Sequence, residues 1–476
     1  MPAPDVEWPG VWWLPEHPDR QVRGTAHFGT RQQLEVSEQF EPPPPLAVKP
    51  SGVVIVDATL EPRDYPVLFG EVDGIGAVTL AEVGGLFANV PANQPWSFRY
   101  AIQGARVQEA DLKFNNLLFT TDHLWDWATP THIRPQKNDG ALVLHFPESR
   151  LFESVDDGVE IRLFTRATAR ISSPKASAEL VAMWEIRLTE PVSIFEAIDR
   201  WLGPLRDLVS FLSGSPNRFT WIAAGGPGWN HPLDLHMWLL GDSLPPSDDS
   251  ISTRDQLFPL ALVKDAPRAV RDWLSQREDL RQVLARLLSS AYAPFVFEDH
   301  RVTNIAQAAE GLHKQLWDHP SLDPSEHRTR VEAAINPDTP KQTRDWAMGV
   351  LSNANQLSLR VRVLELVGFA VEAGLPMAPA DASAFALEVS NGRNRPSHGG
   401  GLVRGGDLDR LYRTFQALEW ILKALLLSRI GVATIDVADR FAHDGNFATV
   451  ASQLGWQPVP RSLTKGPIDQ SNSDET

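Results

Sequence analysis

The chain contains no cysteine among its 476 residues. Disulfides, thiolate zinc sites, iron–sulfur clusters and cysteine nucleophiles are therefore excluded. Long apolar runs are also missing: the most apolar stretch, 418–432, is interrupted by Glu419, Lys423 and Arg429, whereas a membrane helix needs about 20 apolar residues. The first residues have neither the basic region nor the apolar run of a signal peptide. We therefore expect a cytoplasmic protein without a membrane-spanning segment.

Positive charge is scarce as well. Lys and Arg number 44 against 60 Asp and Glu, a net charge of −16, which argues against a generally basic nucleic-acid-binding protein. The segment 391–413 is the exception, with five arginines and two aspartates. If the chain binds phosphate, we expect it to do so there.

Residues 1–245 are predicted to be β-rich. Short alternating segments such as Val22–Phe28 and Val67–Val72 are separated by Gly, Pro and Asn-Asp-Gly signals, a spacing typical of an antiparallel sandwich or barrel. Ser193 followed by Glu196 is a capping box that predicts a helix over about 193–212. The many tryptophans of this region either fill its core or, where exposed, offer stacking surfaces for sugars or bases.

The rest of the chain is predicted to be helical, which makes the fold class α+β and multidomain. Apolar residues at helical spacing indicate a helical connector at 250–298 and an antiparallel bundle at 299–435. A partly disordered extension at 436–476 follows. The helix expected at 408–430 carries more apolar residues than one inner stripe needs, because Ile421, Ala424 and Leu427 lie beside the main row.

The distinctive motif lies between the last two helices of this bundle and contains Arg393, Asn394 and His398, followed by three glycines. Proline disfavours the helical conformation in the residue before it, so Pro396 predicts that the preceding helix ends near Asn391 or Gly392. The three polar residues are then expected on an irregular turn, where their side chains can converge.

This motif resembles the Arg-x(4–6)-His signature of HEPN ribonucleases, in which Asn often follows the Arg. The segments 308–313 and 418–422 are similar to the ApeA-type HEPN branch, and the pair Leu68–Glu71 and Ala77–Leu80 resembles the β-rich domain that accompanies HEPN in ApeA anti-phage proteins. The resemblance implies an endoribonuclease of abortive infection, with transfer RNA as its target and the β-rich domain as sensor or regulator. It also implies a homodimer or a higher even-numbered oligomer. A phage-derived trigger fits such a system, and the surplus apolar residues on 408–430 would form the two-fold interface.

The residue types suit RNA cleavage without a metal or cofactor. His398 can transfer the proton of the 2′-hydroxyl near neutral pH, Arg393 can stabilise charge on the phosphate, and Asn394 can orient either group. Beyond these catalytic candidates, Arg395 and Arg404 would follow the RNA backbone, Ser397 would add a donor, and Glu310 is a weaker candidate for the same site.

Spacing alone does not identify a site, because Arg20 and His27 in the β-rich region match the same pattern. A plainer interpretation is that Arg393 caps a helix, Asn394 forms a turn and His398 is exposed. The alternative function is accordingly a non-catalytic HEPN dimerisation or interaction module, whose β domain binds a nucleotide, a glycan or a phage protein.

Overall fold

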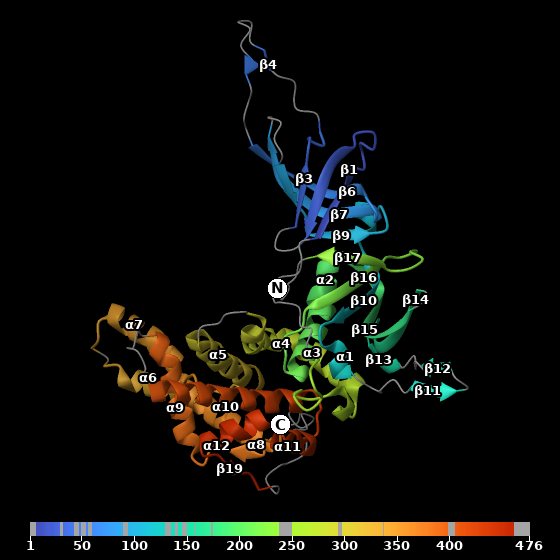
Figure 1. Ribbon diagram of the computed structural model, residues 1–476. Helices are drawn as coiled ribbons and strands as arrows, with labels where there is room; N and C mark the ends of the chain where they lie inside the picture. Colours follow the sequence, from blue (N-terminus) through green and yellow to red (C-terminus); the bar gives the residue numbers. More distant parts are fainter. Residues whose placement is uncertain are drawn as a thin grey trace. The chain divides into compact units, whose positions relative to one another are not determined.

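The computed structural model describes residues 6–28, 32–41, 47–48, 54–55, 60–88, 94–128, 135–138, 141–144, 150–156, 158–172, 175–237, 250–293, 298–336, 338–397 and 405–460. The chain divides into two compact units, Met1–Ala261 and Leu262–Thr476 (Figure 1). The first unit is rich in strands and the second is helical. The predicted combination of a β-rich N-terminal region and an all-α C-terminal region is confirmed.

Antiparallel strands of the first unit form one long sheet in the order β13-β14-β15-β10-β16-β17-β9-β7-β6-β1-β2-β3-β8. The strands at the β8 end of this order are β1 (Val6–Trp13), β2 (Val22–Phe28), β3 (Gln33–Val36), β6 (Leu60–Val72), β7 (Gly76–Ala88) and β8 (Gln94–Ser97). The others are β9 (Tyr100–Gln103), β10 (Phe114–Thr121), β13 (Arg150–Asp156), β14 (Val159–Ser172), β15 (Lys175–Val192), β16 (Phe219–Gly225) and β17 (Leu233–Met237). Two short hairpins, β4 (Ala47–Val48) with β5 (Val54–Ile55) and β11 (Pro135–Asn138) with β12 (Ala141–Leu144), are separate from it.

A barrel closes at one end of this sheet because β8 pairs with β7 as well as with β3. The closing contact joins Gly84 to Ser97, whose hydroxyl donates to the Gly84 carbonyl at 2.8 Å. Before this point β7 pairs with β9 through Val78–Ala81. Between the two partners lies Glu82, which has a φ of 51°, a conformation uncommon outside glycine. The kink at Glu82 thus marks where β7 changes partner and the barrel closes.

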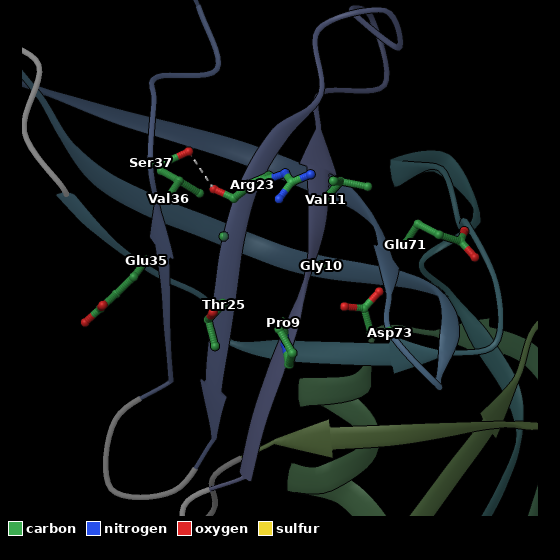
Figure 2. Close-up of a pocket in the computed structure, with 11 residues that line it drawn as sticks. Pro9, Gly10, Val11, Arg23, Thr25, Glu35, Val36, Ser37, Glu71 and Asp73 are labelled. Carbon is green, nitrogen blue, oxygen red and sulfur yellow. Dashed lines mark hydrogen bonds between the residues drawn. The ribbon is translucent and has the colours of Figure 1, made fainter.

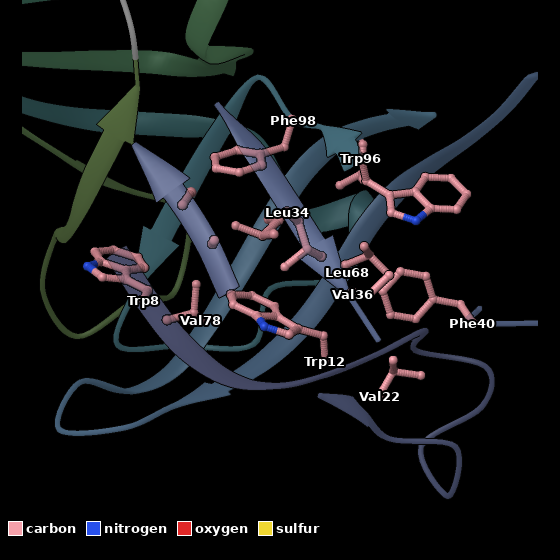
Figure 3. Packing of buried hydrophobic residues seen from close by; sticks show 14 of the residues in the cluster. Trp8, Trp12, Val22, Leu34, Val36, Phe40, Leu68, Val78, Trp96 and Phe98 are labelled. Carbon is pink, nitrogen blue, oxygen red and sulfur yellow. The ribbon is translucent and has the colours of Figure 1, made fainter. Parts of the chain in front are cut away.

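Tryptophans fill the barrel interior (Figure 3). Trp12 is 0% exposed, and its indole N–H donates to the Gly24 carbonyl at 3.2 Å. A Cβ on Gly70 would lie 2.4 Å from Cζ3 of Trp12, and one on Gly85 would lie 2.5 Å from Cε3 of Trp96. The two glycines therefore make room for the two rings. Trp8 belongs to the same cluster, and Trp13, Trp127, Trp184 and Trp201 are buried elsewhere in this unit, so these side chains fill cores rather than offering stacking surfaces.

The helical run predicted after Ser193 is present in the first unit. Ser193 caps α2 (Ile194–Ala197), its hydroxyl accepting from the Glu196 amide at 3.2 Å. A π-helical turn over Ile198–Leu202 leads into α3 (Gly203–Ser213), which is buried along nearly its whole length. It packs against α1 (Leu124–Ala128), and α1 in turn packs against β10 and β15.

The second unit is a helical bundle, drawn from yellow to red in Figure 1. Its helices are α4 (Ala266–Tyr292), α5 (Glu298–Trp317), α6 (Pro324–Ala334), α7 (Lys341–Ser352), α8 (Leu359–Glu372), α9 (Ala382–Ser397), α10 (Gly405–Arg429), α11 (Thr434–Ala442) and α12 (Gly445–Gln453). A short pair of strands, β18 (Met377–Ala378) and β19 (Gln457–Pro458), closes the described part of the unit. The last two helices fall in the segment for which the sequence predicts a partly disordered extension.

Helix α10 lies at the centre of this bundle, in contact with α4, α5, α8, α9, α11 and α12. Its residues Ile421, Ala424 and Leu427 are each 0% exposed. The expectation that these residues form a two-fold interface is therefore wrong: neighbouring helices of the same chain bury them. A polar residue at position 421 would disturb folding and would not report on association.

Helix α9 continues further than the sequence predicts. It runs through Pro396 to Ser397, whereas the proline signal placed its end near Asn391 or Gly392. Packing explains the difference, because a Cβ on Gly392 would lie 2.4 Å from Cδ1 of Leu411 and 2.9 Å from Cε2 of Phe415. This close contact with α10 holds the last turns of α9 in helical form against the local preference of the residue before proline. Arg393 and Asn394 are thus helical residues, and the prediction that they lie on an irregular turn is wrong.

Candidate active site

Arg393 and Asn394 lie near the end of α9, a helix whose start is set by Asp381. The Asp381 carboxylate accepts from the Ala384 amide at 2.9 Å, as expected of an N-cap. At the other end of the helix, Nη1 of Arg393 donates to Oδ1 of Asn394 at 3.2 Å. Asn394 is exposed and Arg393 is half-buried. The amide oxygen of Asn394 therefore helps to position a guanidinium group, which is the group needed at a phosphate.

The other predicted site residues lie at or beyond the limit of the described side chains. Arg395 and Ser397 belong to the last turn of α9, and only their backbone is described. His398 and Arg404 lie outside the described residues. Of the predicted catalytic set, the structure thus brings together Arg393 and Asn394.

Glu310, the weaker candidate, is a half-buried residue of α5. Within the described part of the chain, no hydrogen bond links it to Arg393 or Asn394. Three residues further along α5, however, His313 is fully buried and takes part in a polar network.

This network joins α5 to α8 and was not predicted from the sequence. Nε2 of His313 lies 2.6 Å from Oε2 of Glu365, and Nη1 of Arg362 lies 3.0 Å from Nδ1 of His313. The same Arg362 nitrogen lies 2.8 Å from Asp318, while exposed His319 lies 3.3 Å from Glu365. Arg362 and Glu365 occupy one face of α8 at a spacing of three residues. That spacing is the one signal in the sequence that could have drawn attention to the pair.

A groove separates α9 from α10 beside the motif. It has a volume of about 330 Å³ and is lined by Leu387, Glu388, Asn391, Arg410 and Leu411, among others. Arg410 forms a two-pronged salt bridge with Glu388, through Nε at 2.8 Å and Nη2 at 3.0 Å. Sequence reasoning missed these residues because Glu388 and Arg410 are 22 positions apart.

A larger hollow of about 600 Å³ lies on the outer face of the barrel in the first unit (Figure 2). Strands β1, β2 and β3 supply most of its wall, and Arg23, Glu35, Glu71 and Asp73 give it a mixed charge. Glu71 is also paired with Arg106. The hollow is a candidate binding surface of the β domain, separate from the motif on α9.

In the ranges that the structure describes, no three His, Asp or Glu side chains are grouped as metal ligands. His231 and His236 are five residues apart, which is not a metal-ligand spacing, and Nε2 of His236 lies 2.9 Å from Oε1 of Gln103 in the adjacent strand β9. None of the described helices is long and apolar enough to cross a membrane.

Comparison with known families defines the class of the helical unit. The family model described as Apea-like HEPN matches residues 303–435, a span that includes α9, α10 and the whole motif. HEPN domains are generally RNases. The second unit thus contains a HEPN domain.

The first unit matches a second model, described as ApeA N-terminal domain 1, over residues 7–273, which is more than half of the chain. The chain belongs to the ApeA family. At the level of that family, the assignment supports a nuclease with a role in defence against phage. No curated protein and no solved structure matches the chain at a significant level.

Proposed function

We propose that the protein is a metal-independent endoribonuclease of an abortive-infection system, with its active site at the end of α9. The observation that carries the proposal is the Arg393–Asn394 pair, in which the amide oxygen holds the guanidinium at 3.2 Å inside the segment matched by the HEPN model. The close α9–α10 contact next to this pair is made at Gly392.

In the proposed reaction the 2′-hydroxyl of RNA attacks the adjacent phosphorus. His398 removes the hydroxyl proton and can later return a proton to the 5′-oxygen that leaves. Arg393 donates to the phosphate oxygens on which negative charge builds up, and Asn394 orients Arg393. The products are a 2′,3′-cyclic phosphate and a 5′-hydroxyl, so that atoms and charge balance without a cofactor.

Transfer RNA is the proposed substrate. Arg395 and Arg404 would contact its backbone, Ser397 would donate one further hydrogen bond, and Glu310 has the weakest claim to a role. We assign the β domain to sensing or regulation, with a phage-derived molecule as trigger. HEPN domains typically dimerise, and we propose a homodimer or a higher even-numbered oligomer for this chain as well.

The decisive experiment is incubation of the purified full-length protein with transfer RNA. Wild type is compared with Arg393→Ala and with His398→Ala, and fragments are resolved on a denaturing gel. Arg20→Ala and His27→Ala are the matched controls, since these residues also match the Arg-x(4–6)-His pattern but His27 lies on β2. Cleavage by wild type and the controls, together with its loss in the α9 variants, supports the proposal. Equal activity in both sets of variants overturns it.

The alternative is a non-catalytic HEPN module whose β domain binds a partner. The specific observation in its favour is the barrel hollow of about 600 Å³, which the catalytic proposal does not use. Under this alternative wild type leaves every RNA intact, while Arg23→Ala in the hollow changes partner binding. Loss of RNA cleavage when Arg393 is replaced excludes this alternative.

A further inference from the structure

We propose that the groove between α9 and α10 is a nucleobase subsite, which holds one unpaired base of the RNA next to the cleaved bond. The inference rests on the proposed function, because it assumes that RNA is the substrate. It goes beyond that function by naming residues outside the Arg-Asn-His motif and by requiring a single-stranded target.

The polar wall of the groove is a fixed guanidinium plane. Arg410 is bound to Glu388 through two parallel hydrogen bonds, at 2.8 and 3.0 Å, and Oγ1 of buried Thr414 lies 3.1 Å from the same carboxylate. The carboxylate therefore holds the guanidinium in one orientation. The Arg410 side chain is nevertheless 65% exposed. A planar cation that is both fixed and open to solvent suits stacking on a base.

The remaining walls supply what a base needs besides stacking. Leu387 is 43% exposed and Leu411 contributes a second apolar side chain. Asn391 is exposed, and its amide forms no hydrogen bond with the described residues. An amide offers one donor and one acceptor side by side, which matches the edge of a base. The groove volume of about 330 Å³ is at the lower end of the range for small-ligand sites.

The position of the groove relates it to the motif. Asn391 precedes Asn394 by three residues on α9, so the two side chains occupy the same side of the helix. The rise between them is about 4.5 Å along the helix axis. A base bound at Asn391 therefore places its nucleotide beside the Arg393–Asn394 pair.

Charge and size distinguish a base from other ligands. Arg410 and Glu388 neutralise each other, so the groove does not favour a phosphate or another free anion. A stable protein interface buries about 800 Å² on each partner, whereas this groove offers one exposed leucine beside polar groups. A neutral, planar ligand with a hydrogen-bonding edge fits these walls best.

The test measures binding separately from cleavage. Full-length protein carrying His398→Ala is titrated with fluorescein-labelled single-stranded RNA, and the same titration is repeated with Asn391→Ala or Arg410→Lys added. Arg410→Lys keeps the charge but removes the plane, and we expect it to weaken binding by about 5- to 150-fold, as loss of base stacking does. Arg360→Lys is the matched control, because Arg360 is also exposed and bonds across helices, to Ser383 at 2.8 Å. We expect no change from it.

A second arm uses RNA that lacks one base. Removing the base that occupies the groove should weaken binding to the His398→Ala protein, but should add no further loss when Arg410→Lys is also present. The subsite is overturned if removal of a base weakens binding equally at every position of the RNA, or if both groove variants bind RNA with wild-type affinity. Altered sedimentation of those variants with unchanged RNA affinity overturns it in favour of a protein interface. Failure of the proposed function is a different result, namely that the wild-type protein cleaves no RNA.

As a folding control, each variant should have the same thermal unfolding midpoint as the wild type.

Discussion

His313 and Glu365 are joined by a hydrogen bond of 2.6 Å, between Nε2 and Oε2, that links α5 to α8 at a fully buried histidine. On the other side of the ring, Arg362 donates to Nδ1 at 3.0 Å. Arginine has only donors, so Nδ1 must be the acceptor and Nε2 must carry the hydrogen. His313 is thus neutral in the folded protein, and both partners fix the same tautomer.

The first prediction concerns pH. Burial lowers the pKa of His313, and Arg362 adds to this effect, while Glu365 opposes it. The unfolded chain, with a histidine pKa of about 6.5, therefore binds more protons than the folded chain just below that pH. The contribution of His313 to stability is complete above about pH 6.5 and is lost as the pH falls toward the folded pKa. Hydrogen-exchange protection of α5 and α8 should decrease accordingly.

The control for this prediction is His319, whose pKa is raised, chiefly by its hydrogen bond to the Pro320 carbonyl. Its contribution has the opposite sign: it is present below about pH 6.5 and is lost as the pH rises. His319 is exposed, so we expect His319→Ala to have the smaller effect. The difference in hydrogen-exchange protection between the wild type and His313→Gln should become smaller as the pH is lowered from 8 to 5. A constant difference over this range would contradict the neutral-histidine assignment.

The second prediction concerns Arg362. Replacement by Met leaves the Nδ1 atom of buried His313 without its donor and also removes the contacts with Asp318 and the Leu357 carbonyl. Because His313 is neutral and the side chain of Asp318 is 42% exposed, the chief loss is the unpaired Nδ1 atom, and leaving a buried polar atom without its partner costs about 1 to 3 kcal/mol. Urea unfolding followed by circular dichroism at 222 nm should show this loss in the helical transition. If the Arg362→Met variant is as stable as the wild type, the network does not stabilise the bundle.

The third prediction concerns the barrel core. An added methyl at Gly70 would lie 2.4 Å from Trp12, which is fully buried and cannot move aside. Overpacking of this kind costs about 1 to 3 kcal/mol, so Gly70→Ala should lower the unfolding midpoint. Gly368→Ala is the control: nothing lies within 4 Å of a Cβ at this exposed position of α8. There alanine should instead raise stability by about 0.5 to 1 kcal/mol.

The fourth prediction separates the roles of Arg393 and Asn394. Asn394→Ala retains the cation but removes the oxygen that positions it, and small misplacement of a catalytic group costs about 100-fold. We therefore expect kcat for RNA cleavage to fall by about that factor with little change in KM. Arg393→Ala should cost several orders of magnitude. A change confined to KM would assign Asn394 to substrate binding instead.

The fifth prediction concerns the nucleophile. DNA of the same sequence lacks the 2′-hydroxyl and should be inert, and EDTA should leave cleavage of RNA unchanged. Mass spectrometry of the fragments should find 2′,3′-cyclic phosphate and 5′-hydroxyl ends. A 5′-phosphate end, or inhibition by EDTA, would indicate a metal-activated water and reject the proposed mechanism.

Local signals in the sequence determined much of the secondary structure. Ser193 caps its helix as predicted, and Asp381 caps α9 in the same way, because an N-cap depends only on the next few residues. The alternation in Val22–Phe28 predicted β2 with its observed bounds. The motif on α9 could likewise be found from residue types and neighbours, since it occupies a few consecutive positions.

Tertiary structure decided what depends on distant residues. The Gly392 contact with α10 carries α9 past Pro396, and the surrounding helices bury Ile421, which the sequence suggested for an interface. The bond between His313 and Glu365 spans 52 positions, and that between Glu388 and Arg410 spans 22. Periodicity shows which face of a helix is apolar, but not which neighbours cover it. That choice is made by packing, which places side chains from remote parts of the chain against one another.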